Sequence, residues 1–371
     1  MIFLFGQLKI SKIYLMLINS YYKTRFGTNG ENLVKMFFLL FVILLLSFSV
    51  SLVLNKEKEL NATLEFIQEF GSPIGDEDDI IGMITSFFVD HELNLYVADD
   101  AFKVIRKYST DGKLLEKFAF RAGKGPGEFS NIHSIYLDSL FNVYAIDKIN
   151  SNLTVFDSSN TLLLTRKIKF KPAQIVVYEP MVVDISGFPF TYQGNLIHRY
   201  NLLSGDSVIT TYAERPTDKK FELGFRSGNS GRLVNDKSGF IYFSHFYPYV
   251  IKKFSFDGKL LNIFEGNKDI AAPFRSTITN TIESPAGIRE LVILPSNKLL
   301  VLFVEKKGDE LIQYFHIWDS ENGEFLGAIP CKDLGLNFVR FIRSDNEGNI
   351  YLDFIDPYPH IVKYKLTFEQ Y

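Results

Sequence analysis

Four stretches of seven residues decide the fold, because in each of them an aspartate stands six residues before a tyrosine. They are residues 90–96 (DHELNLY), 138–144 (DSLFNVY), 236–242 (DKSGFIY) and 345–351 (DNEGNIY). In each case an apolar segment enters, polar turn-forming residues follow, and a second apolar segment leaves. This pattern predicts a tight hairpin between two β-strands.

A second hairpin signature lies downstream of two of these stretches. Residues 108–115 read YSTDGKLL, and residues 254–261 read FSFDGKLL. In both copies the aspartate of this signature lies 21 residues after the first aspartate of the unit. An Asp-Gly pair supplies the positive φ that a hairpin turn needs. Each unit is therefore predicted to contain two hairpins, which make four strands.

The units recur at a nearly constant interval. The first two aspartates are 48 residues apart, and the next two gaps, of 98 and 109 residues, are close to double that distance. The missing units are expected midway, at Asp184 (DISGFPF) and at Pro295 (PSNKLLV). Six four-stranded units predict an all-β, six-bladed β-propeller over residues 63–371. The last unit lacks a strand, and residues 63–70 are expected to supply its outer strand and so close the ring.

The composition agrees with a globular β protein. The chain has 371 residues, of which 46% are apolar and 22% charged, with a formal net charge of -3. These values exclude a disordered or collagen-like chain, and they give no broad basic field for nucleic acid. The 36 Phe and 19 Tyr residues favour strands. The single cysteine, Cys331, excludes an internal disulfide and a thiolate metal cluster.

The N-terminal region predicts a membrane-spanning helix. Residues 36–54 read MFFLLFVILLLSFSVSLVL and contain no charge, glycine or proline. A helix of this length extends roughly 28 Å, enough to cross a bilayer core. Residues 1–35 carry a formal charge of +4, whereas the linker 55–62 is balanced. The basic leader is therefore expected to stay in the cytoplasm and the propeller to lie outside it, in the cell envelope. An uncleaved signal anchor and a cleaved secretory signal both stay open.

The second unit resembles an NHL repeat. It reads RAGKGPGEF at residues 121–129, NVYAID at 142–147 and LTVFD at 153–157. These stretches are similar to the glycine-rich junction, the strand ending in aspartate and the following strand of that repeat. Over residues 63–367 the chain resembles bacterial envelope propellers with six NHL-like blades. The resemblance implies a fold more than a chemistry, since such propellers serve as binding scaffolds, lactonases and lyases.

Candidate site residues gather on one predicted face of the ring. That face collects the loops between blades and the loops between second and third strands. Two long insertions, 214–229 and 266–287, belong to it and are the expected functional additions. The ligand-binding candidates on this face are Asp99, Arg121, Lys124, Asp147, Arg226, His245 and Arg275.

Two of these candidates have a structural alternative. Asp99 and Asp147 end equivalent strands, so their carboxylates are also suited to cap the turns that follow. With Asn131 they form the candidate calcium site, because carboxylate and amide oxygens are the ligands that Ca²⁺ prefers. No other cofactor is indicated.

Three functions stay open from the sequence. The favoured hypothesis is an envelope propeller that binds a small molecule or a protein partner through the loop-rich face and is not an enzyme. The alternative is a calcium-dependent hydrolase or lactonase with its site at the mouth of the channel. The third is a membrane-tethered spacer without a ligand. The sequence does not identify the ligand.

Overall fold

The aspartate–tyrosine stretches form the turns between the first two strands of their sheets. Asp138 shows why these residue types recur. Its Oδ1 accepts hydrogen bonds from the backbone N–H groups of Leu140 (2.9 Å) and Asn142 (3.0 Å). Its Oδ2 accepts the hydroxyl of Tyr144 at 2.8 Å. The aspartate therefore caps the turn, while the buried tyrosine ties the turn to the second strand.

The same arrangement is present in other units. The backbone bonds from the second and fourth residues after the aspartate recur at Asp90, Asp236 and Asp345. The tyrosine hydroxyl reaches the aspartate at 3.2 Å for Tyr242 and 3.3 Å for Tyr351. Burial and the neighbouring aspartate raise the pKa of these tyrosines above the ordinary value of 10.0. Their hydroxyls are thus protonated donors at neutral pH.

We describe a computed structural model of the chain. It describes residues 60–369 apart from 76–77, 79, 189–193, 205–207, 216–230, 267–269, 278–281 and 284. The predicted leader 1–35 and membrane segment 36–54, together with most of the linker 55–62, lie outside these residues. Among the residues that it does describe, no helix is both long and apolar enough to span a membrane.

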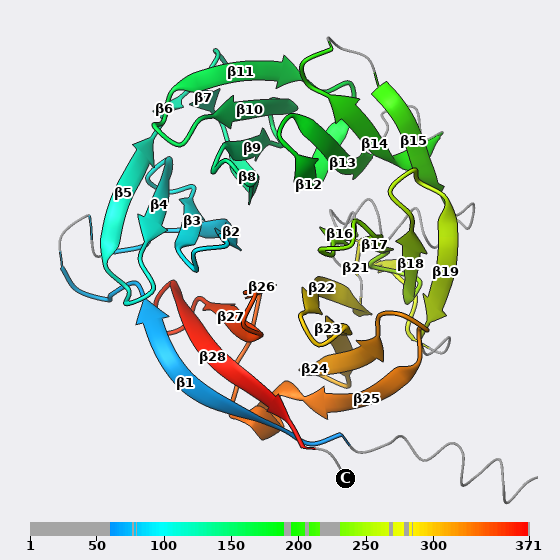
Figure 1. Cartoon of the computed structure of the whole chain (residues 1–371). Helices are drawn as coiled ribbons and strands as arrows, with labels where there is room; N and C mark the ends of the chain where they lie inside the picture. The colour runs from blue at the N-terminus through cyan, green and yellow to red at the C-terminus, as the bar shows by residue number, and fades with distance from the viewer. Residues whose placement is uncertain are drawn as a thin grey trace, which may run out of the picture. The chain divides into compact units, whose positions relative to one another are not determined.

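Six four-stranded antiparallel sheets surround a central axis in the described part of the chain (Figure 1). We call these sheets blades 1–6. Blades 1–3, from the axis outward, are β2 (Ile84–Val89), β3 (Leu95–Asp99), β4 (Val104–Tyr108) and β5 (Leu114–Ala119); β8 (Ile132–Leu137), β9 (Val143–Asp147), β10 (Asn152–Phe156) and β11 (Leu162–Lys167); and β12 (Lys171–Glu179), β13 (Val182–Phe188), β14 (Asn195–Asn201) and β15 (Val208–Glu214).

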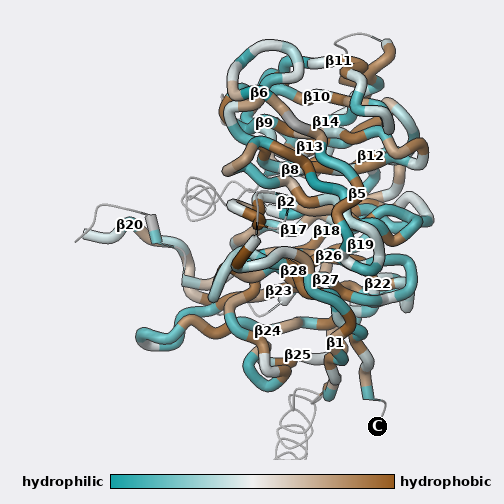
Figure 2. The backbone as a smooth tube through the Cα atoms, turned by 90° about the vertical axis from the view of Figure 1, so that its left-hand side faces the viewer, coloured by the Kyte–Doolittle hydropathy of each residue, from teal (hydrophilic) through white to brown (hydrophobic). Residues whose placement is uncertain are grey.

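Blades 4–6 follow the same order. They are β16 (Arg232–Asn235), β17 (Ile241–Ser244), β18 (Val250–Phe254) and β19 (Leu260–Glu265); β22 (Ala286–Leu294), β23 (Lys298–Lys307), β24 (Glu310–Asp319) and β25 (Phe325–Pro330); and β26 (Ile342–Ser344), β27 (Asn349–Phe354), β28 (His360–Phe368) and β1 (Ala62–Phe70). The connections add a parallel pair, β6 (Arg121–Ala122) with β7 (Glu128–Phe129), an antiparallel pair, β20 (Phe274–Arg275) with β21 (Ile282–Glu283), and the 3-10 helix η1 (Cys331–Leu334). Seen from the side, β20 projects from one face of the ring (Figure 2).

The outer strand of blade 6 comes from the start of the propeller. β1 pairs antiparallel with β28, from Ala62 opposite Phe368 to Phe70 opposite Ile361. The Phe70 ring is 1% exposed and contacts the ring of Tyr108 in blade 1, with centroids 5.9 Å apart. Residues from both ends of the propeller therefore build blade 6.

The hydrophobic core is divided among the interfaces between blades. Each of the six apolar clusters in the described residues contains side chains from two successive blades, as when Ile105 of blade 1 packs with Ile135 and Val143 of blade 2. Each sheet is therefore covered on both faces. This explains why the strands are apolar on both sides, as β3 and β9 are, with every residue buried.

The prediction for blade 3 is wrong in its register. Asp184 does not open a turn but lies inside β13, and the chain turns earlier, at residues 180–181. Its buried carboxylate accepts two hydrogen bonds from the Arg199 guanidinium, both at 2.8 Å, and also those of the Tyr178 and Tyr212 hydroxyls. This buried ion pair stands in place of the turn signature that blades 1, 2, 4 and 6 carry. The prediction at Pro295 is confirmed, since residues 295–297 join β22 to β23.

Candidate functional site

The inner strands carry a belt of polar contacts around the axis. Glu290 of β22 is 1% exposed, and its two carboxylate oxygens pair with Arg232 of β16 and Arg343 of β26. Arg343 also donates from Nε to the carbonyl of Phe87 in β2 at 3.0 Å. The belt thus links blades 4, 5, 6 and 1. Each arginine keeps about a fifth of its side chain exposed, 20% for Arg232 and 18% for Arg343.

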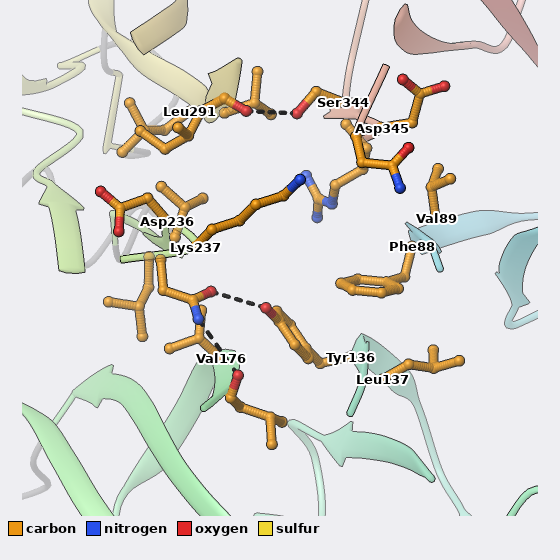
Figure 3. A pocket seen from close by; sticks show the side chains of 18 of the residues that line it. Phe88, Val89, Tyr136, Leu137, Val176, Asp236, Lys237, Leu291, Ser344 and Asp345 are labelled. Atoms are coloured by element: carbon orange, nitrogen blue, oxygen red, sulfur yellow. Dashed lines mark hydrogen bonds between the residues drawn. The ribbon is translucent and has the colours of Figure 1, made fainter. Parts of the chain in front are cut away.

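Aromatic and amide groups complete the belt on the other side. The rings of Phe88 and Tyr136 have centroids 4.5 Å apart. The Tyr136 hydroxyl donates to Oδ1 of Asn235 at 2.8 Å, and Nδ2 of Asn235 donates to the Val177 carbonyl at 3.4 Å (Figure 3). Burial raises the pKa of Tyr136 to about 12, although Asn235 and Arg343 act in the opposite direction. This tyrosine is therefore a neutral hydrogen-bond donor at neutral pH.

These groups enclose a cavity on the axis of the ring, which we call the axial cavity. Its volume is about 640 Å³, and residues of all six inner strands line it. The volume lies within the usual range for small-molecule sites. The turns between first and second strands also line it, including Asp90, Asp138 and Lys237. The cavity therefore reaches the face of these turns, which is opposite the loop-rich face predicted from the sequence.

The polar side chains at the mouth of the axial cavity, where the short turns lie, point in different directions. Figure 3 shows the Lys237 side chain extending across the axial cavity, whereas the carboxylates of Asp236 and Asp345 point away from its middle. Asp236 and Asp345 accept backbone hydrogen bonds within their own turns. The cavity is thus lined by arginine, lysine and amide donors beside an aromatic pair.

Asp99 lies at the end of β3 and is fully buried. Its carboxylate accepts hydrogen bonds from the backbone N–H groups of Gly82, Met83 and Ala101, at 2.9, 2.9 and 3.2 Å. Arg106 Nε is 3.5 Å from Oδ2 of the same group. Asp99 therefore binds the backbone of residues 82–83, the segment that leads into its own blade.

Asp147 has the equivalent place in blade 2 and is also fully buried. It accepts the N–H of Ser130 at 2.6 Å and the N–H of Asn150 at 2.8 Å. The Asn131 side chain donates to Asp100 at 3.1 Å rather than to Asp147. Only the N–H groups of Ala101 and Asn150 belong to the turns that follow these aspartates, as the structural alternative expected. The other backbone donors lie in the segments that lead into the two blades.

The glycine-rich junction carries Arg121 and Lys124, which are both exposed. β6 and β7 pair within it, and Oε2 of Glu128 accepts the N–H of Gly125 at 2.9 Å. A Cβ atom at Gly123 would lie 2.0 Å from the same oxygen, so a larger residue here would require the Glu128 side chain to move. The junction is thus a tightly folded connection between blades 1 and 2.

The remaining sequence candidates are dispersed. His245 is 1% exposed and makes an edge contact with the ring of Phe243, and burial lowers its pKa to about 3. Arg275 is an exposed residue of β20. Arg226 lies outside the described residues. None of the candidates that the structure describes lines the axial cavity.

The described residues hold no cluster of three or more His, Cys, Asp or Glu side chains placed to bind a metal ion. The sequence candidates did not include the residues that line the cavity, which are Phe88, Tyr136, Arg232, Glu290 and Arg343. They come from five different blades, and no local motif marks them. Lys237, which also lines the cavity, does lie in a local motif, because it follows the aspartate of a turn signature.

The fold and the cavity define the class of the protein, which is a six-bladed β-propeller. A family model described as "6-bladed beta-propeller", DUF5128, matches residues 88–271. The likeness to NHL repeats stays a prediction. No curated protein matches the sequence.

Solved propellers of low sequence identity share the fold. A member of the DUF4221 family from Bacteroides vulgatus has a TM-score of 0.60 at 8% identity, with 85% of this chain and 100% of that chain covered. A candidate exported protein from Bacteroides fragilis has a TM-score of 0.58 at 12% identity, covering 85% and 97%. Virginiamycin B lyase from Staphylococcus aureus has a TM-score of 0.51 at 10% identity, covering 83% and 100%. At these identities the likeness extends to the fold alone.

Proposed function

We propose that this chain is a binding propeller that holds a small ligand in its axial cavity. The observation that carries the proposal is the cavity of about 640 Å³, to which all six inner strands contribute. A buried belt of polar contacts fixes the orientation of its lining side chains, and such preorganisation lowers the cost of binding. The loop-rich face is a second surface at which the favoured sequence hypothesis places a partner.

We place this function in the cell envelope. The uncharged residues 36–54 and the basic leader before them support a membrane tether or a secretory signal. The similarity of the fold to a candidate exported protein agrees with an extracytoplasmic location. Fractionation of cells that express the full chain tests this part: recovery of the chain in the cytosol would contradict it.

The ring closure is part of the same proposal. A cavity shared by six blades keeps its shape only while blade 6 stays attached to blade 1. The pairing of β1 with β28 and the contact of Phe70 with Tyr108 support closure by the N-terminal strand. A tether that enters at β1 would then hold the rim of the propeller.

Ligand binding in the axial cavity is tested with a neutral probe and a variant that fills the cavity. Ser134 lines the cavity and is 3% exposed. Benzamide binding is measured by ligand-observed NMR with the wild-type chain, with Ser134→Phe and with Phe88→Ala. We expect both variants to lose binding, while circular dichroism stays unchanged. Binding that is equal in all three proteins would contradict the proposal.

The calcium-dependent hydrolase stays a sequence-based alternative. In the structure, Asp99 and Asp147 already accept backbone hydrogen bonds, and binding Ca²⁺ there would require some of these bonds to be given up. No feature of the described site favours this alternative over ligand binding.

A further inference from the structure

The balance of charge inside the axial cavity points to the kind of ligand. Arg232 and Arg343 share a single carboxylate, that of Glu290. Lys237 adds a third positive group, whose side chain extends across the cavity (Figure 3). The inner strands themselves therefore hold two cations against one anion, and Lys237 lies at the mouth of the cavity together with four aspartates. Positive charge gathered in a partly enclosed space is stabilised by a negative partner, because water screens it less there.

The acidic residues of the mouth supply little of that compensation. The lining includes one aspartate from each turn signature. In all four, Oδ1 accepts two backbone N–H groups of its own turn. Asp345 also has Lys363 Nζ 3.3 Å from Oδ2. These carboxylates are thus directed into their turns and, for Asp345, neutralised inside the blade.

Another part of the wall offers an aromatic surface. The contacting rings of Phe88 and Tyr136 are tilted by 50° and form a platform in the cavity. Aromatic platforms favour ligands with a flat ring or an apolar ring face. Lys237 is an exposed member of the mouth, so its amino group is accessible to an incoming ligand.

We infer that the axial cavity selects ligands that carry a carboxylate on a six-membered ring, with the carboxylate toward Lys237 and the arginine belt and the ring on the Phe88–Tyr136 platform. This inference rests on the proposed function and names its ligand class. The chemistry fits aromatic acids and sugar acids alike, and the test distinguishes them.

The test compares two acids with their neutral counterparts. Benzoate is paired with benzamide, and glucuronate with glucose, in titration calorimetry of the wild-type chain. The variant is Lys237→Met, because replacing either arginine would also disturb Glu290. The matched control is Lys124→Met, an exposed lysine outside the cavity lining.

We expect at least one acid to bind about tenfold more tightly than its neutral partner in low salt. Lys237→Met should remove most of that preference and Lys124→Met none of it. Raising NaCl from about 50 to about 500 mM should reduce the difference in affinity between an acid and its neutral partner, because the Debye length shortens. A preference in the benzoate pair identifies aromatic acids, and one in the glucuronate pair identifies sugar acids.

Three results would overturn the inference, and they differ in their consequences. If the probes bind but neither acid exceeds its neutral partner, the selection for carboxylates is wrong while ligand binding in the cavity stands. If none of the four probes binds, the proposed function fails as well. An equal loss of acid binding in Lys237→Met and Lys124→Met would also contradict the inference.

Discussion

The buried Asp184–Arg199 pair allows a demanding test of blade 3, the blade whose sequence departs most from the others. Asp184 is 0% exposed, and Arg199 is 3% exposed. Arg199→Met removes both 2.8 Å hydrogen bonds and, among the described residues, the positive charge that pairs with the carboxylate. The hydroxyls of Tyr178 and Tyr212 remain as donors.

The expected cost is large because the substitution leaves a buried charge without its partner. Breaking such a pair from one side costs about 3–5 kcal/mol of the free energy of unfolding. The double variant Asp184→Asn/Arg199→Met removes the charge as well and keeps an oxygen that accepts from the tyrosines. Its cost should be smaller, about 1–2 kcal/mol.

Urea denaturation followed by circular dichroism measures these differences, with the exposed Arg121→Met as the control. The reasoning is refuted if Arg199→Met costs no more than Arg121→Met. It is also refuted if the double variant is less stable than the single one, since the cost would then not come from an uncompensated charge.

Four further predictions follow from other contacts. Tyr144→Phe removes a hydroxyl that donates to Asp138 and accepts the N–H of Met181, so urea denaturation should show a loss of about 1–2 kcal/mol; no loss would contradict the role of the turn signature. Deletion of β1 (Ala62–Phe70) should lower the thermal midpoint by about 5 °C or more, and an unchanged midpoint would refute closure by this strand. Burial lowers the pKa of His245 from the ordinary 6.5 to about 3 in the folded state, so the stability that the neutral imidazole contributes is fully present above pH 6.5 and is lost as the pH falls toward 3. His245→Phe should therefore reduce the loss of unfolding free energy over this pH range, by up to about 1.4 kcal/mol per pH unit. An identical pH profile of stability in the variant would contradict the burial of a neutral imidazole. Calcium at millimolar concentration should not shift the thermal midpoint, whereas a stabilisation that Asp147→Asn abolishes would favour the hydrolase alternative.

The blade architecture was predictable because each hairpin is specified locally. The aspartate that caps a turn and the tyrosine that bonds to it lie six residues apart, and in two blades the Asp-Gly pair of the outer hairpin follows that aspartate at the same distance of 21 residues. Their spacing therefore appears directly in the sequence. The turn of blade 3 was predicted at the wrong residues because Asp184 binds Arg199 on the neighbouring strand. Such a contact leaves no short-range pattern in the sequence.

The candidate site was less predictable, because its residues come from different blades and meet only in the folded structure. Glu290 lies 58 residues from Arg232 and 53 from Arg343 along the chain, yet it pairs with both. Strand-end aspartates were conspicuous in the sequence, but backbone donors occupy Asp99 and Asp147. Sequence position also favoured the loop-rich face, whereas the axial cavity reaches the face of the short turns.

A crystal structure of the protein soaked with benzoate tests the central claim most directly. The account predicts benzoate in the axial cavity, with its carboxylate within hydrogen-bond distance of Lys237 and its ring against Phe88 and Tyr136. Benzoate bound instead beside Arg121 and Lys124, with the axial cavity holding none, would contradict it.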